Sequence, residues 1–256
     1  MRALPDENLK YPVLITLEDG ATGSGFFLND SDQSLYLVTA KHVLFNPQSN
    51  LLWNELAKIT SYADNNEITD PIIFRLDFSI LSKTGCIIFD KKYDAVAVKI
   101  TTGSVSKNGL KMGKLCDGVS KIQFPEGAKL LVAEKVMCKK FDDVLVANDA
   151  FIIGYPTSIG DKKVPQINYE QPLVRKGIVA GKNQEKRTII IDCEVYYGNS
   201  GGIVIELEQL DYSTKRPWVI GLISELVPFS KKWTQNSGYS VVVPIEIVLD
   251  LLESKK

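Results

Sequence analysis

The sequence predicts an all-β protein made of two β units of similar size and one C-terminal helix. Short runs rich in Val, Ile, Phe and Tyr recur along the 256 residues, and Gly, Asn, Asp and Pro separate them. Strands of this length at near-regular spacing indicate barrels or sandwiches rather than a parallel βαβ array. The predicted strands cover residues 13–17, 25–28, 35–39, 72–76, 95–100, 129–133, 150–154, 173–180, 188–192, 203–206 and 218–224.

Two segments favour helix instead of strand. Residues 51–59 follow Asn50, a suitable N-cap, although their apolar pattern is irregular. After Pro244, apolar residues recur at positions i, i+3, i+4 and i+7, and two lysines at the chain end suit the negative end of a helix dipole. We therefore expect one helix over 51–59 and a second at the C-terminus.

The middle of the chain changes character between residues 101 and 127. Thr-Thr-Gly-Ser, Lys-Asn-Gly, Met-Gly-Lys and Pro-Glu-Gly follow one another there, which is the composition of turns and linkers. This composition predicts a division into two domains, residues 1–125 and residues 126–256.

Composition excludes several function classes. The chain carries 30 basic and 31 acidic side chains, so it lacks the excess of Lys and Arg that a nucleic-acid-binding surface needs. No apolar run approaches the roughly 20 residues that cross a bilayer, so no membrane contact is expected. The single histidine rules out metal sites with two or three histidines in one chain, and we expect neither metal nor cofactor.

Cysteine usage and the first residues bear on the compartment. The N-terminal residues are polar and contain no apolar stretch of signal-peptide length. The four cysteines are widely spaced and form no Cys-x-x-Cys pair. We therefore expect a cytoplasmic protein with free thiols at Cys86, Cys116, Cys138 and Cys193.

A Gly-Asn-Ser-Gly-Gly turn at residues 198–202 is the most informative motif. Ser200 lies among three glycines between two predicted strands. Glycine at position 198 permits positive φ, which lets the N–H groups of Gly198 and Ser200 converge on one point, as a developing oxyanion requires. The alternative is a glycine-rich hairpin with an incidental serine.

The only histidine and a nearby aspartate complete a candidate catalytic set. A nucleophilic serine needs a base with a near-neutral pKa, and His42, at the end of a buried strand, is the one side chain that qualifies. A third group must orient the imidazole. We favour Asp94, at the start of an apolar strand, over Asp90, which precedes two lysines in an exposed turn. The alternatives are a structural histidine and an aspartate that only caps a turn.

These motifs together resemble the chymotrypsin-fold serine proteases. In chain order the resemblance rests on Thr-Gly-Ser-Gly-Phe-Phe-Leu, Thr-Ala-x-His, Asp-Ala-Val-Ala-Val-Lys-Ile and Gly-Asn-Ser-Gly-Gly. Boxes over 152–156, 176–181, 219–224 and 238–244 resemble strands of the family's second barrel. The His, Asp, Ser order is the one known for this fold. The sequence is most similar to bacterial trypsin-like peptidases that include the HtrA catalytic domain and glutamyl endopeptidases.

The resemblance implies a fold and a mechanism. The fold would be two six-stranded antiparallel β-barrels of chymotrypsin type with a C-terminal α-helix. Ser200 would attack a peptide carbonyl, His42 would act as general base and Asp94 would orient His42. The N–H groups of Gly198 and Ser200 would form the oxyanion hole. A protein or peptide substrate would add as a short strand beside Ser224, Glu225 and Leu226.

The resemblance also suggests a specificity pocket and a form of regulation. Glu194 matches the position at the pocket floor of trypsin-like members, where an acid would favour Lys or Arg. The alternative is that Glu194 points outward or pairs with a nearby Lys. Gly238 would keep the pocket wall open. Asn199 replaces the acid that pairs with a newly cut N-terminus in zymogens, so we expect no activation by N-terminal cleavage. A cytosolic protease then needs narrow specificity or an activating protein partner.

Two other functions stay open from the sequence. A catalytically silent protease-fold peptide-binding module has the same fold, but such proteins usually lack a triad member or the glycine before the serine. An esterase or acyltransferase uses the same machinery but does not need a peptide-binding strand over 219–224.

Overall fold

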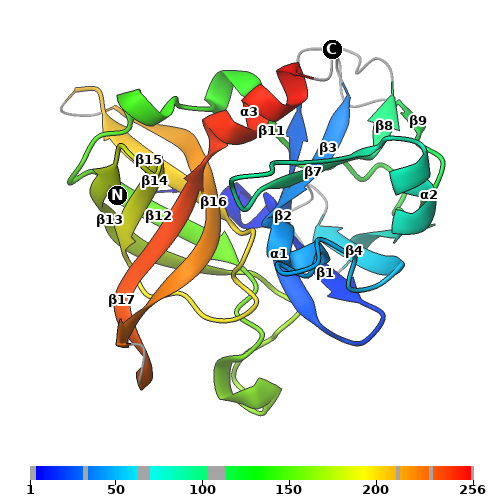
Figure 1. The fold of residues 1–256 in the computed structure, drawn as a ribbon, viewed down its shortest axis with the longest axis horizontal. Helices are drawn as coiled ribbons and strands as arrows, with labels where there is room; N and C mark the ends of the chain where they lie inside the picture. The colour runs from blue at the N-terminus through cyan, green and yellow to red at the C-terminus, as the bar shows by residue number, and fades with distance from the viewer. Residues whose placement is uncertain are drawn as a thin grey trace.

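The computed structural model describes residues 4–30, 34–62, 70–102, 113–211, 214–230 and 233–254. The prediction of an all-β protein with a C-terminal helix is confirmed. In Figure 1 a β-barrel occupies the left of the molecule, a large β-sheet occupies the right, and helix α3 lies across the top of their junction.

The N-terminal half forms one large sheet. Its strands are ordered β10-β5-β4-β1-β2-β3-β7-β6, and β11 pairs in parallel with β2. In chain order the strands are β1 (Pro12–Leu17), β2 (Thr22–Asn29), β3 (Leu35–Thr39), β4 (Leu56–Tyr62), β5 (Pro71–Asp77), β6 (Ile87–Phe89), β7 (Val96–Lys99), β10 (Val119–Gln123) and β11 (Ala133–Glu134). A separate two-stranded sheet pairs β8 (Thr101–Thr102) with β9 (Lys114–Leu115).

The C-terminal half closes into a six-stranded antiparallel barrel, as predicted. Its strands follow one another around the barrel as β12-β13-β14-β17-β16-β15. Their bounds are β12 (Asp149–Gly154), β13 (Leu173–Asn183), β14 (Thr188–Asp192), β15 (Ile203–Gln209), β16 (Lys215–Ser230) and β17 (Trp233–Pro244). The hairpin of β16 and β17 extends beyond the barrel at the lower left of Figure 1.

The helices are short. In the part of the chain that the structure describes they are α1 (Lys41–Leu44), α2 (Phe78–Lys83) and α3 (Ile245–Glu253). The 3₁₀ turns there are η1 (Asp6–Lys10), η2 (Lys135–Met137), η3 (Phe141–Asp143) and η4 (Ile159–Lys162). Ion pairs from Lys135 to Glu253 and from Arg187 to Glu246 hold α3 in place. In the described residues, no helix is both long and apolar enough to span a bilayer.

Two expectations for local structure in the N-terminal half differ from the structure. The helix expected over 51–59 is wrong because β4 begins at Leu56 and pairs with β1 and β5 on its two edges. Ala57 and Ile59 are buried and Lys58 is exposed, which is the alternation of a strand. The strand expected over 129–133 is also wrong, because only its last residue, Ala133, lies in a strand, β11.

The sheet itself is also larger than the six-stranded barrel that was expected. Nine strands lie in its described part, and their hydrogen-bonded order does not close. One extra strand is β10, which lies in the segment that resembled a linker. Strand β10 pairs with β5 along its length, but only Val119 of its residues is buried. Because the other side chains face solvent, its sequence is mostly polar. The boundary between residues 125 and 126 stays a prediction.

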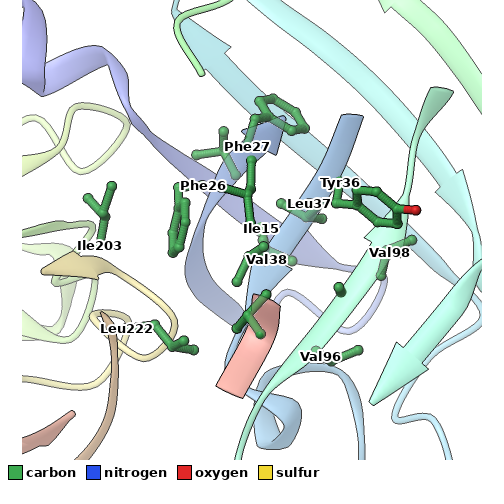
Figure 2. Close-up of a cluster of buried hydrophobic side chains, with 14 of the residues drawn as sticks. Ile15, Phe26, Phe27, Tyr36, Leu37, Val38, Val96, Val98, Ile203 and Leu222 are labelled. Carbon is green, nitrogen blue, oxygen red and sulfur yellow. The ribbon is translucent and has the colours of Figure 1, made fainter. Parts of the chain in front are cut away.

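The main hydrophobic core joins the two halves. It contains most buried residues of the N-terminal sheet together with apolar residues of the barrel and of α3. Figure 2 shows Phe26 of β2 beside Ile203 of β15 and Leu222 of β16. A second core of buried residues fills the barrel. Because the first core spans the junction, it fixes the position of the two halves relative to each other.

Candidate active site

His42 lies on a single helical turn at the end of β3. Strand β3 ends at Thr39, and α1 begins two residues later. The hydroxyl of Thr39 donates to the carbonyl of Ser24 over 2.7 Å, which joins the end of β3 to β2. The indole Nε1 of Trp53 donates to the carbonyl of His42 over 3.0 Å. These bonds fix the backbone that carries the imidazole.

Asp94 lies against His42 and accepts three hydrogen bonds. Its Oδ1 accepts the backbone N–H of His42 over 2.9 Å, and its Oδ2 lies 2.7 Å from Nδ1 of the imidazole. The hydroxyl of Ser224, on β16 of the barrel, donates to the same Oδ2 over 2.7 Å. Asp90, the competing carboxylate, instead accepts the N–H groups of Lys92 and Tyr93 in its own turn.

This environment keeps Asp94 ionised. Burial alone would raise the pKa of the Asp94 carboxyl, but the hydrogen bonds from His42 and Ser224 and the charge of His42 bring that pKa below its ordinary value. An ionised Asp94 accepts a hydrogen from Nδ1, and this assigns the tautomer in which Nε2 carries a free lone pair. The geometry therefore leaves Nε2 able to take a proton.

Ser200 lies in the loop between β14 and β15, and backbone bonds to both halves hold this loop. The carbonyl of Ser200 accepts the N–H of Ser24 in β2 over 2.9 Å. The N–H of Gly201 donates to the carbonyl of Ile223 in β16 over 2.7 Å, and Ile223 donates in return to Gly202 over 2.9 Å. The serine is thus clamped between the N-terminal sheet and the barrel.

Glycine is required at position 201 on two grounds. Its φ is +82°, where side chains are strained. A Cβ at this position would also lie 2.1 Å from the carbonyl oxygen of Ser24 and 2.2 Å from Oγ1 of Thr39. The close approach brings the serine loop against the end of β3, just before His42.

The two N–H groups expected to form the oxyanion hole have no acceptor among the described residues. Gly198 has a φ of +99°, and its carbonyl accepts the hydroxyl of Ser24 over 2.6 Å. Within the described part of the chain, neither the N–H of Gly198 nor that of Ser200 donates a hydrogen bond. Unpaired amides beside a serine are the donors that a tetrahedral oxyanion needs.

A cleft of about 500 Å³ joins these groups. The cleft contains three side chains of the predicted triad and the three residues predicted to border a substrate strand. Its lining is Lys41, His42, Pro47, Lys92, Tyr93, Asp94, Val195, Tyr196, Tyr197, Ser200, Ile223, Ser224, Glu225 and Leu226. No hydrogen bond joins Ser200 Oγ to His42 in the described residues. Such bonds are commonly long before substrate is bound.

The structure places two predicted pocket residues outside this lining. Glu194 accepts the hydroxyl of Tyr196 over 2.7 Å, and its Oε2 lies 3.7 Å from Nη2 of Arg175. Gly238 has a φ of +88°, donates its N–H to Oδ1 of Asn236, and has no atom within 4 Å of where a Cβ would lie. Neither residue is part of the cleft surface.

Burial disfavours the thiolate form of Cys138 and Cys193. All four cysteines are free thiols in the structure. Burial raises the pKa of Cys138 to about 12 and also raises the pKa of Cys193, the cysteine nearest Ser200 in sequence. Among the described residues, no group of three or more His, Cys, Asp or Glu side chains could hold a metal ion.

The sequence did not reveal every residue that shapes the site. Ser224 was assigned to substrate binding alone, although its hydroxyl bonds Asp94. Ser24 had no assigned role, yet its hydroxyl donates to Gly198 and accepts the N–H of Tyr155 over 2.8 Å. The sequence feature that could have pointed to Ser24 is its place as a small polar residue between two glycines in a predicted strand. No sequence feature pointed to Trp53.

Comparison with known proteins identifies the family. Residues 23–210 match the trypsin-like peptidase domain. The chain belongs to the trypsin-like peptidase family. A protein of this family binds protein or peptide substrates, and the resemblance to trypsin-like serine proteases is confirmed.

A solved structure confirms the chymotrypsin type of fold. The structure titled "Crystal structure of Deg5" matches with a TM-score of 0.54 and 17% sequence identity, over 97% of this chain and 95% of that chain. At this identity the similarity concerns the fold alone. A search of curated proteins found no significant match.

Proposed function

We propose that this trypsin-like peptidase is an active serine endopeptidase with Ser200, His42 and Asp94 as its catalytic triad. The observation that carries the proposal is the carboxylate of Asp94, which binds both the backbone and Nδ1 of His42 in the cleft that contains Ser200. This contact orients the imidazole and stabilises its protonated form.

The reaction follows from these positions. Nε2 of His42 accepts the proton of Ser200 as Oγ attacks the peptide carbonyl. The N–H groups of Gly198 and Ser200 bind the oxyanion of the tetrahedral intermediate. His42 then protonates the leaving amine, and an acyl-enzyme remains on Ser200. Water attacks this ester with His42 again as base, which releases the acid and restores the serine.

The substrate would extend beside β16. Pairing of β16 with β15 ends at Leu222, and the backbone of Ile223 bonds the Ser200 loop. The next residues, Ser224 to Leu226, line the cleft. An extended peptide that pairs with this edge would present its carbonyl to Ser200, and main-chain bonds would supply sequence-independent affinity.

The proposal includes a cytoplasmic location and restricted activity. A cytoplasmic endopeptidase needs either narrow specificity or gating by a protein partner. Asn199, directly before the nucleophile, is buried and uncharged, so it cannot form the ion pair of a zymogen cleavage. Purified protein is therefore expected to cleave casein slowly at best. Brisk casein cleavage would contradict both restrictions.

Active-site labelling tests the catalytic proposal. A fluorophosphonate probe should label the wild-type chain covalently, and Ser200→Ala should abolish the labelling. Ser240→Ala is the matched control, because Ser240 is buried and its hydroxyl has no partner among the described residues. Folded wild-type protein that shows no Ser200-dependent labelling, with or without candidate partners, would favour a silent peptide-binding module.

A further inference from the structure

The C-terminal half, which carries Ser200, contributes several apolar side chains to the cleft. Val195 and Tyr196 come from the segment before the nucleophile, and Ile223 and Leu226 come from β16. Val195 and Ile223 are buried. These four side chains would surround the substrate residue whose carbonyl Ser200 attacks. Aliphatic and aromatic walls favour an uncharged side chain there, because a charged one would lose its hydration without a partner.

The charged residues that line the cleft do not change this preference for an uncharged substrate side chain. Lys41 and Lys92 belong to the half that carries His42. Asp94 is committed to His42 and Ser224. Glu225 is exposed to solvent at the rim, where its charge is screened. The acid with the sequence position to recognise Lys or Arg is therefore Glu194.

Glu194 is held away from the cleft by two neighbours. The hydroxyl of Tyr196 donates to Oε2 of Glu194, and the guanidinium of Arg175 lies 3.7 Å from the same oxygen. The guanidinium carbon of Arg175 also lies 5.0 Å from the centre of the Tyr196 ring, which suits a cation–π contact. The ring of Tyr196 lines the cleft, whereas Glu194 and Arg175 do not.

Arg175 is itself fixed by the barrel. It lies in β13, where it pairs with Ile152 of β12. Its side chain is 33% exposed, and its Nε is buried without a hydrogen-bond partner among the described residues. A partly buried guanidinium needs a nearby negative charge, and Glu194 supplies it. The carboxylate of Glu194 is therefore already paired with Arg175 and is not available to a substrate.

We infer that Arg175 determines specificity by neutralising Glu194, and that the pocket beside Ser200 accepts peptides with an apolar residue before the scissile bond. This inference rests on the proposed function. Removal of the Arg175 charge leaves Glu194 without a cation, next to the ring that lines the cleft. A substrate Lys or Arg side chain then supplies the missing positive charge.

Binding to the Ser200→Ala variant tests the inference without requiring catalysis. Four fluorescent peptides would differ only in the residue before the scissile bond, which is Leu, Phe, Lys or Glu. The Leu and Phe peptides should bind about tenfold more tightly than the Lys peptide. In a Ser200→Ala, Arg175→Gln double variant, affinity for the Lys peptide should rise about tenfold, and the cationic pocket probe p-aminobenzamidine should begin to bind.

Two further variants control the experiment. Lys176→Gln removes a positive charge from the next residue of β13, where Lys176 pairs with Asp149 over 3.0 Å, and should not change the ranking of the peptides. If thermal denaturation shows that the Arg175→Gln variant is unfolded, the peptides are tested on a Ser200→Ala, Glu194→Gln variant instead. Glu194→Gln should leave the ranking of peptide affinities unchanged, because the substrate does not reach Glu194 in the presence of Arg175.

The outcomes separate the two proposals. Tighter binding of the Lys peptide with Arg175 intact, a tenfold loss of Lys-peptide binding in Glu194→Gln, or no binding of any peptide would overturn the inference. An unchanged Lys-peptide affinity in folded Arg175→Gln protein would overturn it as well. The proposed function is judged separately, by fluorophosphonate labelling of the wild-type chain.

Discussion

The two halves of the candidate site are held by different kinds of interaction. His42 and Asp94, in the N-terminal half, are fixed to each other by side-chain hydrogen bonds. Ser200, in the C-terminal half, makes no side-chain hydrogen bond within the described residues, and its position comes from backbone bonds to Ser24 and the tight approach of Gly201. The base is thus oriented by charge, and the nucleophile by backbone shape.

This difference has a physical reason. An imidazole rotates about two side-chain bonds and needs a partner to select one ring orientation and tautomer. A serine side chain rotates about one bond before its oxygen, so fixing its backbone restricts the oxygen to three staggered positions. Substitution of a side chain that orients His42 should therefore reduce catalysis and spare the fold, whereas a substitution that changes the backbone shape of the Ser200 loop should disturb the fold first.

Asp94→Asn should have the largest effect on activity. The amide cannot accept both His42 donors in the same way, so the imidazole loses its tautomer and its charge partner, and kcat should fall about 10⁴-fold. Steady-state kinetics on a cleaved peptide measures the loss. Asp90→Asn, which alters only the turn four residues earlier, should stay within about twofold of wild type. Equal losses in both variants would remove Asp94 from the triad.

Gly201→Ala should have the largest effect on stability. It combines a strained φ of +82° with atoms 2.1 and 2.2 Å from the new Cβ, and the free energy of unfolding should fall by about 3 kcal/mol. Gly20→Ala is the matched control, with a φ of +85° and nothing within 4 Å. It should cost only about 1 kcal/mol. Urea denaturation of both variants compares them, and equal costs would show that the close approach contributes nothing.

Ser224→Ala should have an intermediate effect on activity. It removes one donor from Oδ2 of Asp94 and leaves both His42 bonds, so kcat should fall about tenfold with little change in KM. Ser240→Ala again provides the control, since its buried hydroxyl bonds no described residue. A rise in KM with unchanged kcat would show instead that Ser224 only binds substrate.

The smallest expected effect is on acid stability. The pKa of Asp94 is lower in the folded chain than its ordinary value of 3.8. Its contribution to stability is therefore present above pH 3.8 and is lost as the pH falls through the lower folded-state pKa. Unfolding free energies measured from pH 5 downward should decrease more steeply in wild type than in Asp94→Asn. Parallel curves would contradict the lowered pKa.

The sequence was informative wherever function depends on residues close together in the chain. Ser200, His42 and Asp94 each belong to a short motif that can be read from neighbouring residues alone. The structure brings these three residues to one cleft. The strand alternation also predicted most of the barrel. Local composition was sufficient to predict these turns and strands, because each motif lies within the turn or strand that it specifies.

The sequence was less informative where a residue's role depends on a distant partner. Glu194 lies against Arg175 of β13, and no pattern in the residues around Glu194 predicts this contact. Residues 51–59 followed an N-cap, yet pairing of β4 with strands on both edges outweighed the helical signal. Strand β10 was missed because it buries one side chain and exposes the rest.

One small side chain has a consequence for how the protein is made. Ser24 binds Ser200, Gly198, Tyr155 and Thr39 through its N–H, hydroxyl and carbonyl, and three of these partners lie more than 130 residues later in the chain. During synthesis His42 and Asp94 leave the ribosome long before Ser200, and the loop of Ser200 can bind to β2 only after β2 has been made. A growing or half-folded chain therefore lacks the complete triad that we propose.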